Sequence, residues 1–191
     1  MDYLNTYSQL FAKGYNKFGS NKLNIEHTLN FIKTNPVENM IDISSGAGVL
    51  VKIISEQHPK IKITCTDLSN FNNLNFNFIE LDLSKEKDFE KIVNNKYDLL
   101  TCLDVLEHLE KNMIPYVLEN FSKISNNVIL SIANHSDIQN DVELHTIIEN
   151  LEYWIPEIEK FFSIVELKTH EFIQPDDSIN YLYLITLKRK N

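Results

Sequence analysis

Apolar residues recur along the chain with two periods, one typical of helices and one typical of buried strands. Residues 24–36 have the helical period, because Ile25, Leu29 and Ile32 fall on one face and Pro36 ends the pattern. Two further helical patterns lie at 49–58 and 114–124. Strand-like segments lie at 39–44, 60–67, 75–82, 96–104 and 126–134, and the fourth of them is almost wholly apolar, as is typical of a strand buried on both faces.

The last third of the chain predicts one or two helices followed by a pair of strands. Residues 141–162 contain four apolar residues at helical spacing, namely Leu144, Ile147, Ile148 and Leu151. Residues 162–172 and 179–189 are strand-like, and the segment between them predicts a hairpin. We therefore expect one α/β domain over residues 1–191, with helices on both faces of a seven-stranded, mostly parallel sheet whose last strand is antiparallel.

Composition narrows the class of protein. The chain has 191 residues, of which 43% are apolar and 24% charged, as in ordinary soluble domains. No apolar run is long enough to cross a membrane, and the first residues do not resemble a signal peptide, so we expect a cytoplasmic protein. Cys65 and Cys102 lie in strand-like segments and are predicted to be core thiols rather than a disulfide or metal site.

The charge of the chain argues against nucleic acid as a partner. The formal net charge is −9, and Arg189 is the sole arginine. Proteins that bind nucleic acid need a basic face to neutralise phosphates. A small molecule is therefore the expected partner, and the oligomeric state stays open.

Polar residues end each of the five predicted parallel strands. A single aspartate at such a place is most often a helix cap or a loop residue. Carboxyl ends of parallel strands, however, meet at one edge of the sheet, where ligands bind. An acidic residue at or just after five successive ends therefore predicts a ligand site. The residues concerned are Asp42, Ser44, Asp67, Asp82, Asp104, Asn134, His135 and Asp137.

The segment DISSGAG, residues 42–48, predicts a tight turn between a strand and a helix. Gly46 and Gly48 would let a ligand approach the backbone closely. Asp67 ends the next strand, where an acidic side chain accepts hydrogen bonds from ribose hydroxyls. Position 51 is valine, where a dinucleotide loop would have its third glycine, and the carboxylate of Asp42 would repel a phosphate. An acidic residue just before the turn, here Asp42, instead suits a cationic ligand such as S-adenosylmethionine.

Four segments together resemble the successive motifs of class I S-adenosylmethionine-dependent methyltransferases. They are NMIDISSGAGVLVKII, KITCTDLS, NFIELDLS and YDLLTCLDVLEHLEK, within residues 39–133. The branch that includes the ubiquinone and biotin biosynthesis methyltransferases is the most similar. The resemblance implies a Rossmann-like fold, with a helical lid or cap over 1–35, a cofactor-binding half over 36–133 and an acceptor-side half over 134–191.

The resemblance also implies a role for each cofactor-site residue. Asp42, Ser44, Gly46 and Gly48 would face the amino-acid end of S-adenosylmethionine. Asp67 would hold the ribose with Leu68 beneath the adenine, and Asp82 and Leu83 would bind the adenine edge. Leu103 and Asp104 would line the methionine part. Ser44 departs from the family pattern, which has glycine there, and this puts cofactor affinity in doubt.

Histidines on the acceptor side are candidates for a general base. His145 is our first candidate and His135 the second, because imidazole suits removal of a proton from a hydroxyl. A loop histidine bonded to backbone is the alternative for each, and His135, Asp137 and His145 could also be read as metal ligands. His108 belongs to the shared DVLEHL motif and is expected to be structural or a pocket wall.

The N-terminal segment carries aromatic residues at helical spacing, Tyr7, Phe11, Tyr15 and Phe18. They predict either a helix packed on the domain or a lid over the cofactor. Tyr153 and Trp154 are expected in the core.

The resulting hypothesis is a methyltransferase that acts on oxygen in a small molecule or a saccharide precursor, with no residue assigned as a metal ligand. The alternative is an inactive, methyltransferase-like subunit that binds a partner, as Ser44 would allow. A nicotinamide oxidoreductase is disfavoured by Val51 and Asp42. The acceptor itself, N- or C-methylation and metal dependence stay open.

Overall fold

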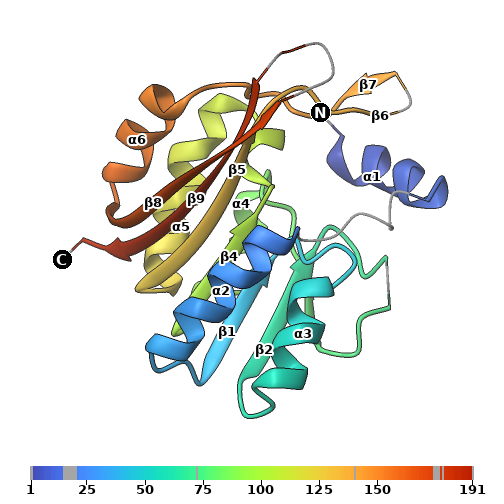
Figure 1. The fold of residues 1–191 in the computed structure, drawn as a ribbon. Coiled ribbons are helices and arrows are strands. Elements are labelled where there is room, and N and C mark those ends of the chain that lie inside the picture. The colour runs from blue at the N-terminus through green and yellow to red at the C-terminus, as the bar shows by residue number, and fades with distance from the viewer. Residues whose placement is uncertain are drawn as a thin grey trace.

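A seven-stranded sheet forms the centre of the protein (Figure 1). The computed structural model describes residues 2–14, 21–71, 73–139, 141–173, 177 and 179–190. The strands lie side by side in the order β3-β2-β1-β4-β5-β9-β8. Their bounds are β1 Asn39–Ile43, β2 Lys62–Asp67, β3 Asn77–Glu80, β4 Leu99–Leu103, β5 Asn127–Asn134, β8 Phe162–Ile173 and β9 Ile179–Arg189.

The direction of the strands confirms the predicted fold class. β1 pairs in parallel with β2 and β4, and the parallel pairing continues to β3 on one side and β5 on the other. β9 is antiparallel to both of its neighbours, β5 and β8. The strand order reverses between β1 and β4, which makes the carboxyl ends of these two strands the point where an open sheet binds ligands.

Helices cover both faces of the sheet, as the apolar pattern predicts. Successive residues of β1 point to opposite faces, so that Met40 packs with α2 (Lys22–Thr34) and α3 (Val49–Gln57). Ile41 instead joins the larger core cluster, to which α5 (Ile114–Ile124) contributes Phe121 and α6 (Leu151–Glu159) contributes Trp154. In Figure 1, α2 and α3 lie on the side of the sheet toward the viewer. Trp154 is fully buried, which confirms its predicted core position.

Residues 141–162, where the pattern predicts one or two helices, form one helix, α6, and the part of the pattern over 141–150 is not helical. The segment instead forms β7 (Val142–Glu143), paired with β6 (Ile138–Gln139), and then an irregular stretch to residue 150. Its backbone bonds to other parts of the chain: Leu144 N–H donates to Asp137 O and Ile147 N–H to Glu107 O. The side chains of Leu144 and Ile147 are buried all the same, whereas that of Ile148 is 47% exposed, so the apolar spacing indicates burial at two of its positions and no helix.

Four further elements complete the description, and the first two bear on the site. α1 (Tyr3–Ala12) is an N-terminal helix, and η2 (Leu106–His108) is a single 3₁₀ turn just after β4. The others are α4 (Glu86–Phe89) and the 3₁₀ turn η3 (Lys111–Met113). Cys65 and Cys102 are buried free thiols, as predicted. Within the described ranges, every helix is too short or too polar to span a bilayer.

Candidate functional site

A cavity of about 910 Å³ opens at the carboxyl ends of the parallel strands. This size is within the usual range for sites that enclose a small molecule. Its walls come from α1, the start of α2, the turn after β1, the ends of β2, β4 and β5, the residues after β3, and the β8–β9 end of the sheet. Eight of the ten predicted cofactor residues line it, with both predicted histidines. They are Ser44, Gly46, Asp67, Leu68, Asp82, Leu83, Leu103 and Asp104, together with His135 and His145.

The turn between β1 and α3 is built from residues in the left-handed backbone region. Ser44, Gly46 and Gly48 have φ of 57°, 52° and 68°. A glycine adopts this conformation freely, whereas a serine is strained by about 1 kcal/mol or more. Ser44 therefore occupies a position where glycine would be the least strained residue, and the turn forms despite this strain. It is tied to the end of β2, because Ser45 N–H donates to Thr66 O at 2.7 Å.

Asp67 joins the turn to the end of β2 through its carboxylate. Oδ2 accepts from Gly46 N–H at 2.9 Å, and Oδ1 accepts from Leu68 N–H at 2.8 Å. Burial raises the pKa of this carboxyl to about 6, although both backbone donors act in the opposite direction. A carboxylate offers about four lone-pair positions, so acceptor capacity is left for ligand hydroxyls in the cavity.

Asp42 and Gly48 are the two predicted residues that do not line the cavity. Asp42 is 5% exposed, and its Oδ1 accepts from Thr101 Oγ1 at 2.6 Å. Burial raises the pKa of this carboxyl to about 6. Gly48 is the N-cap of α3. Both residues therefore lie behind the residues that line the cavity.

Asp82 follows β3 and has local partners on both carboxylate oxygens. Ser84 donates to Oδ1 from its backbone N–H at 2.9 Å and from its hydroxyl at 2.6 Å. The Lys85 ammonium forms an ion pair with Oδ2 at 3.0 Å. The neighbouring Leu81 and Leu83 are buried and give this corner of the cavity an apolar wall. A strand-end pattern predicts Asp82 but not its lysine partner.

Asp104 follows β4 with φ of 56°, in the left-handed region. Ser131 Oγ donates to its Oδ1 at 2.6 Å and Asn24 Nδ2 to its Oδ2 at 2.9 Å. Burial raises the pKa of this carboxyl too. Asn24 comes from α2 and is fully buried, a contact that the apolar pattern of α2 does not reveal.

Three neighbouring histidines, His108, His135 and His145, line another part of the cavity. His145 Nδ1 donates to the carbonyl of His135 at 2.5 Å, and the rings of His145 and His108 meet edge to face with centroids 4.5 Å apart. Burial lowers the pKa of His145. Burial, and then the neighbouring His145, lower the pKa of His108 to about 3. His108 lines the cavity, as expected of a pocket wall, and Asp137 does so as well.

The N-terminal helix α1 closes one side of the cavity. Tyr3, Tyr7 and Phe11 line it, and Tyr7 Oη is 2.9 Å from His108 Nδ1. Phe11 stacks on Phe71 with centroids 4.3 Å apart. The aromatic spacing predicts a helix here, and the aromatic side chains of α1 line the cavity. Tyr15 and Phe18, which the same pattern includes, lie outside the described residues.

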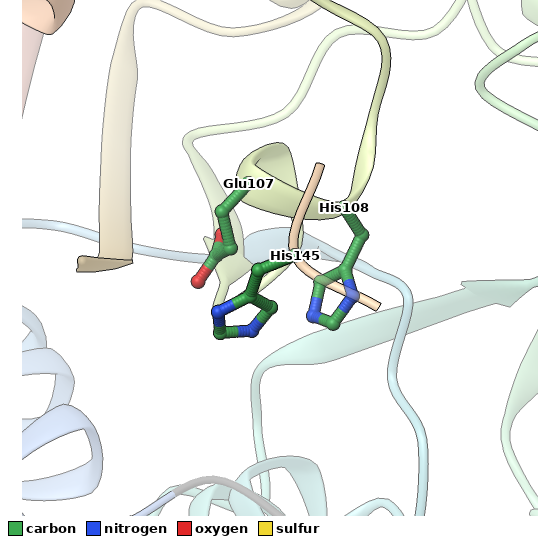
Figure 2. A group of neighbouring side chains, drawn as sticks. All are labelled: Glu107, His108 and His145. Carbon is green, nitrogen blue, oxygen red and sulfur yellow. The ribbon is translucent and has the colours of Figure 1, made fainter. Parts of the chain in front are cut away.

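One group of side chains in the described part of the chain has the spacing of a metal site. A carboxylate oxygen of Glu107 and one ring nitrogen each of His108 and His145 lie within 4.8 Å of one another. Figure 2 shows the three side chains projecting into a common space, two from η2 and His145 from the stretch after β7. Of the three residues named above as alternative metal ligands, His145 is a member and His135 and Asp137 are not. The sequence places Glu107 beside His108 just after the fourth strand, but sequence reasoning did not interpret these two residues as metal ligands.

Comparisons with known proteins give matches to solved structures alone. No family model matches the chain, and no curated protein matches it. The N-methyltransferase NodS from Bradyrhizobium japonicum, solved with S-adenosyl-L-homocysteine, matches with a TM-score of 0.60 and 14% identity over 87% of this chain and 86% of that chain. The chain has the fold of class I methyltransferases.

Two further structures support this conclusion on the fold. Coclaurine N-methyltransferase, bound to N-methylheliamine and S-adenosylhomocysteine, has a TM-score of 0.68 at 11% identity, over 86% of this chain and 69% of that chain. The methyltransferase domain of bacterial-CtHen1-CN has a TM-score of 0.59 at 19% identity, over 85% of this chain and 97% of that chain. At such identities the likeness concerns the fold, and the resemblance to the ubiquinone and biotin branch stays a prediction.

The two glycines of the turn give a matched pair of substitutions. A Cβ at Gly48 would lie 2.5 Å from Leu74 Cδ2, whereas a Cβ at Gly46 meets nothing within 4 Å among the described residues. Both changes to alanine strain a left-handed residue by about 1–2 kcal/mol. We expect Gly48→Ala to lower the free energy of unfolding by about 1–3 kcal/mol more than Gly46→Ala, because it also overpacks the core. Urea unfolding measures this, and equal losses would contradict the assigned packing.

The raised pKa of Asp42 predicts a stability effect that depends on pH. A folded pKa near 6, above the unfolded value of 3.8, means that stability is lost as pH rises through 6. Asp42→Asn removes this loss. We therefore expect the variant to gain about 1 kcal/mol relative to wild type on going from pH 5 to pH 8. Thermal unfolding of both proteins at the two pH values tests this, and a gain that shrinks with pH would show that Asp42 is not a buried acid.

Proposed function

We propose that the protein is an S-adenosylmethionine-dependent methyltransferase that acts on an oxygen of a small molecule. The observation that carries this proposal is the convergence of eight predicted cofactor residues on one cavity of a methyltransferase-like fold. These residues come from the turn after β1 and from the ends or following residues of β2, β3 and β4. Neighbouring folds crystallised with S-adenosylhomocysteine support the choice of cofactor.

The residues present fit this cofactor in charge and shape. The position of Gly46, where a Cβ would meet open space, lets the backbone of the turn contact a ligand directly. Asp67 would accept hydrogen bonds from both ribose hydroxyls, with Leu68 and Leu83 against the adenine and Asp82 at its amino group. Leu103 and Asp104 would line the methionine part, whose cationic centres suit buried carboxylates.

The bound cofactor would supply a methyl group already activated by its positive sulfur. What the chain must add is alignment of the acceptor, exclusion of water and removal of a proton. His145 and His135 line the cavity beside Asp104 and are our candidates for the last task. Tyr7 and Phe11 of α1 would cover the bound molecules and keep water out.

A small-molecule acceptor fits the enclosure and the charge of the protein. The cavity has room for the cofactor and a compact acceptor, and a net charge of −9 disfavours a polyanion. Ser44 is the residue that supports the alternative of an inactive, methyltransferase-like subunit. Because Ser44 adopts the left-handed conformation and the turn forms, this support is weak.

Binding of S-adenosylhomocysteine to the purified chain tests the proposal. By calorimetry we expect a single site, with Asp67→Ala weakening the affinity by about 10- to 100-fold, the loss of two hydrogen bonds to a charged acceptor. Asp98→Ala is the matched control. Its carboxylate also accepts from two backbone N–H groups, those of Glu38 and Asn39, but at the start of β1, at the other end of the strands.

The comparison of the two variants separates binding from folding. Asp98→Ala should leave the affinity within about twofold of wild type while losing a similar pair of backbone contacts. Absence of binding by the folded wild type would refute the proposed function. Equal affinity losses in both variants would refute the role of Asp67.

A further inference from the structure

Glu107 is an acidic side chain held entirely inside the protein. It has no exposed surface, and its Oε1 accepts from the backbone N–H of Ala133 at 2.7 Å. Oε2 is buried and has no hydrogen-bond partner in the described part of the chain. A buried polar atom without a partner costs a few kcal/mol of desolvation. Such an atom calls for a ligand that the protein itself does not provide.

His145 presents a nitrogen lone pair near this carboxylate. A carbonyl oxygen can only accept, so the bond from His145 Nδ1 to His135 O places the ring proton on Nδ1. In the neutral ring the lone pair is then on Nε2. This arrangement, with one ring nitrogen donating to a carbonyl, is the one by which proteins orient histidines that bind metals.

His108 completes a set of three ligand atoms. Its ring nitrogen, that of His145 and an oxygen of Glu107 lie within 4.8 Å of one another, so a small shift would bring all three to one ion (Figure 2). Tyr7 Oη bonds the Nδ1 of His108 and orients that ring. His108 and His145 also line the cavity, so the remaining coordination positions would face it.

We propose that Glu107, His108 and His145 bind a divalent cation at the acceptor end of the cavity. Two imidazoles and one carboxylate suit transition metals with mixed nitrogen and oxygen preference, so Mn²⁺ or Zn²⁺ is favoured over Mg²⁺ and Ca²⁺. Three protein ligands with open positions are typical of a site that takes a substrate oxygen.

The role of this site rests on the proposed function. An acceptor hydroxyl bound to the cation would lose its proton more readily and be fixed beside the methyl group. The acceptor oxygen then bonds to the methyl carbon, the carbon–sulfur bond breaks, and its electron pair stays on sulfur. The hydroxyl proton goes to His135, whose ring centroid is 5.1 Å from that of His145. Of the two candidate bases named above, His145 would then be a metal ligand, which leaves His135 as the base.

Metal binding alone, with neither cofactor nor acceptor present, tests the site. The tag-free chain is stripped with a chelator and titrated by calorimetry with Mn²⁺ and, separately, Zn²⁺. We expect about one cation per chain, and at least about tenfold weaker binding in Glu107→Gln and His145→Ala. Tyr7→Phe should also weaken binding, because it releases the orientation of His108. His170→Ala, on β8, is the control and should bind as wild type does.

Each result decides for or against the metal site. No binding by wild type, or unchanged binding in both Glu107→Gln and His145→Ala, overturns it. Glu107→Gln keeps an oxygen for Ala133 N–H, and an unchanged affinity for S-adenosylhomocysteine shows that a variant is folded. Cofactor binding without metal binding leaves the proposed function standing and refutes the metal site. Metal binding without cofactor binding leaves the metal site standing and refutes the proposed function.

Discussion

The site depends on the hydrogen bond by which the carboxylate of Asp67 holds the backbone N–H of Gly46. This contact, at 2.9 Å, joins the turn after β1 to the end of the neighbouring strand β2. The turn has three residues with positive φ within five positions, a strained path for Ser44 at least. Because Gly48 is the N-cap of α3, the same contact also bears on where that helix starts on the sheet. The shape of the cavity wall and the packing of α3 therefore both depend on the hydrogen bond between Asp67 and Gly46.

Buried acids at this edge are the second feature of the molecule. Burial raises the pKa of Asp42, Asp67 and Asp104, so that each carboxylate is held at a cost to stability when ionised. Such groups persist where their charge is used, which favours a functional site over a structural cluster. A ligand with positive charge would offset part of the cost on binding, and the same holds for a cation beside Glu107. Stability and binding are therefore coupled through these acids.

The sheet and most of the cavity could be predicted from the sequence because both follow from local patterns. Strand periodicity placed β1, β2, β4 and β5, and strand ends in a parallel sheet meet at one edge. The segment 141–150 could not be predicted, since its backbone bonds to Asp137 and Glu107 rather than to itself. The roles of Glu107 and Asn24 were missed for a related reason. Their roles depend on contacts with distant residues, Ala133 and Asp104, that no spacing along the chain records.

A crystal structure of the protein with S-adenosylhomocysteine tests the central claim most directly. We predict that the ribose hydroxyls lie within hydrogen-bond distance of the Asp67 carboxylate, with the adenine between Leu68 and Leu83 and the sulfur toward His135 and His145. A ligand bound with its ribose away from Asp67, or outside this cavity, would contradict the assignment of the site.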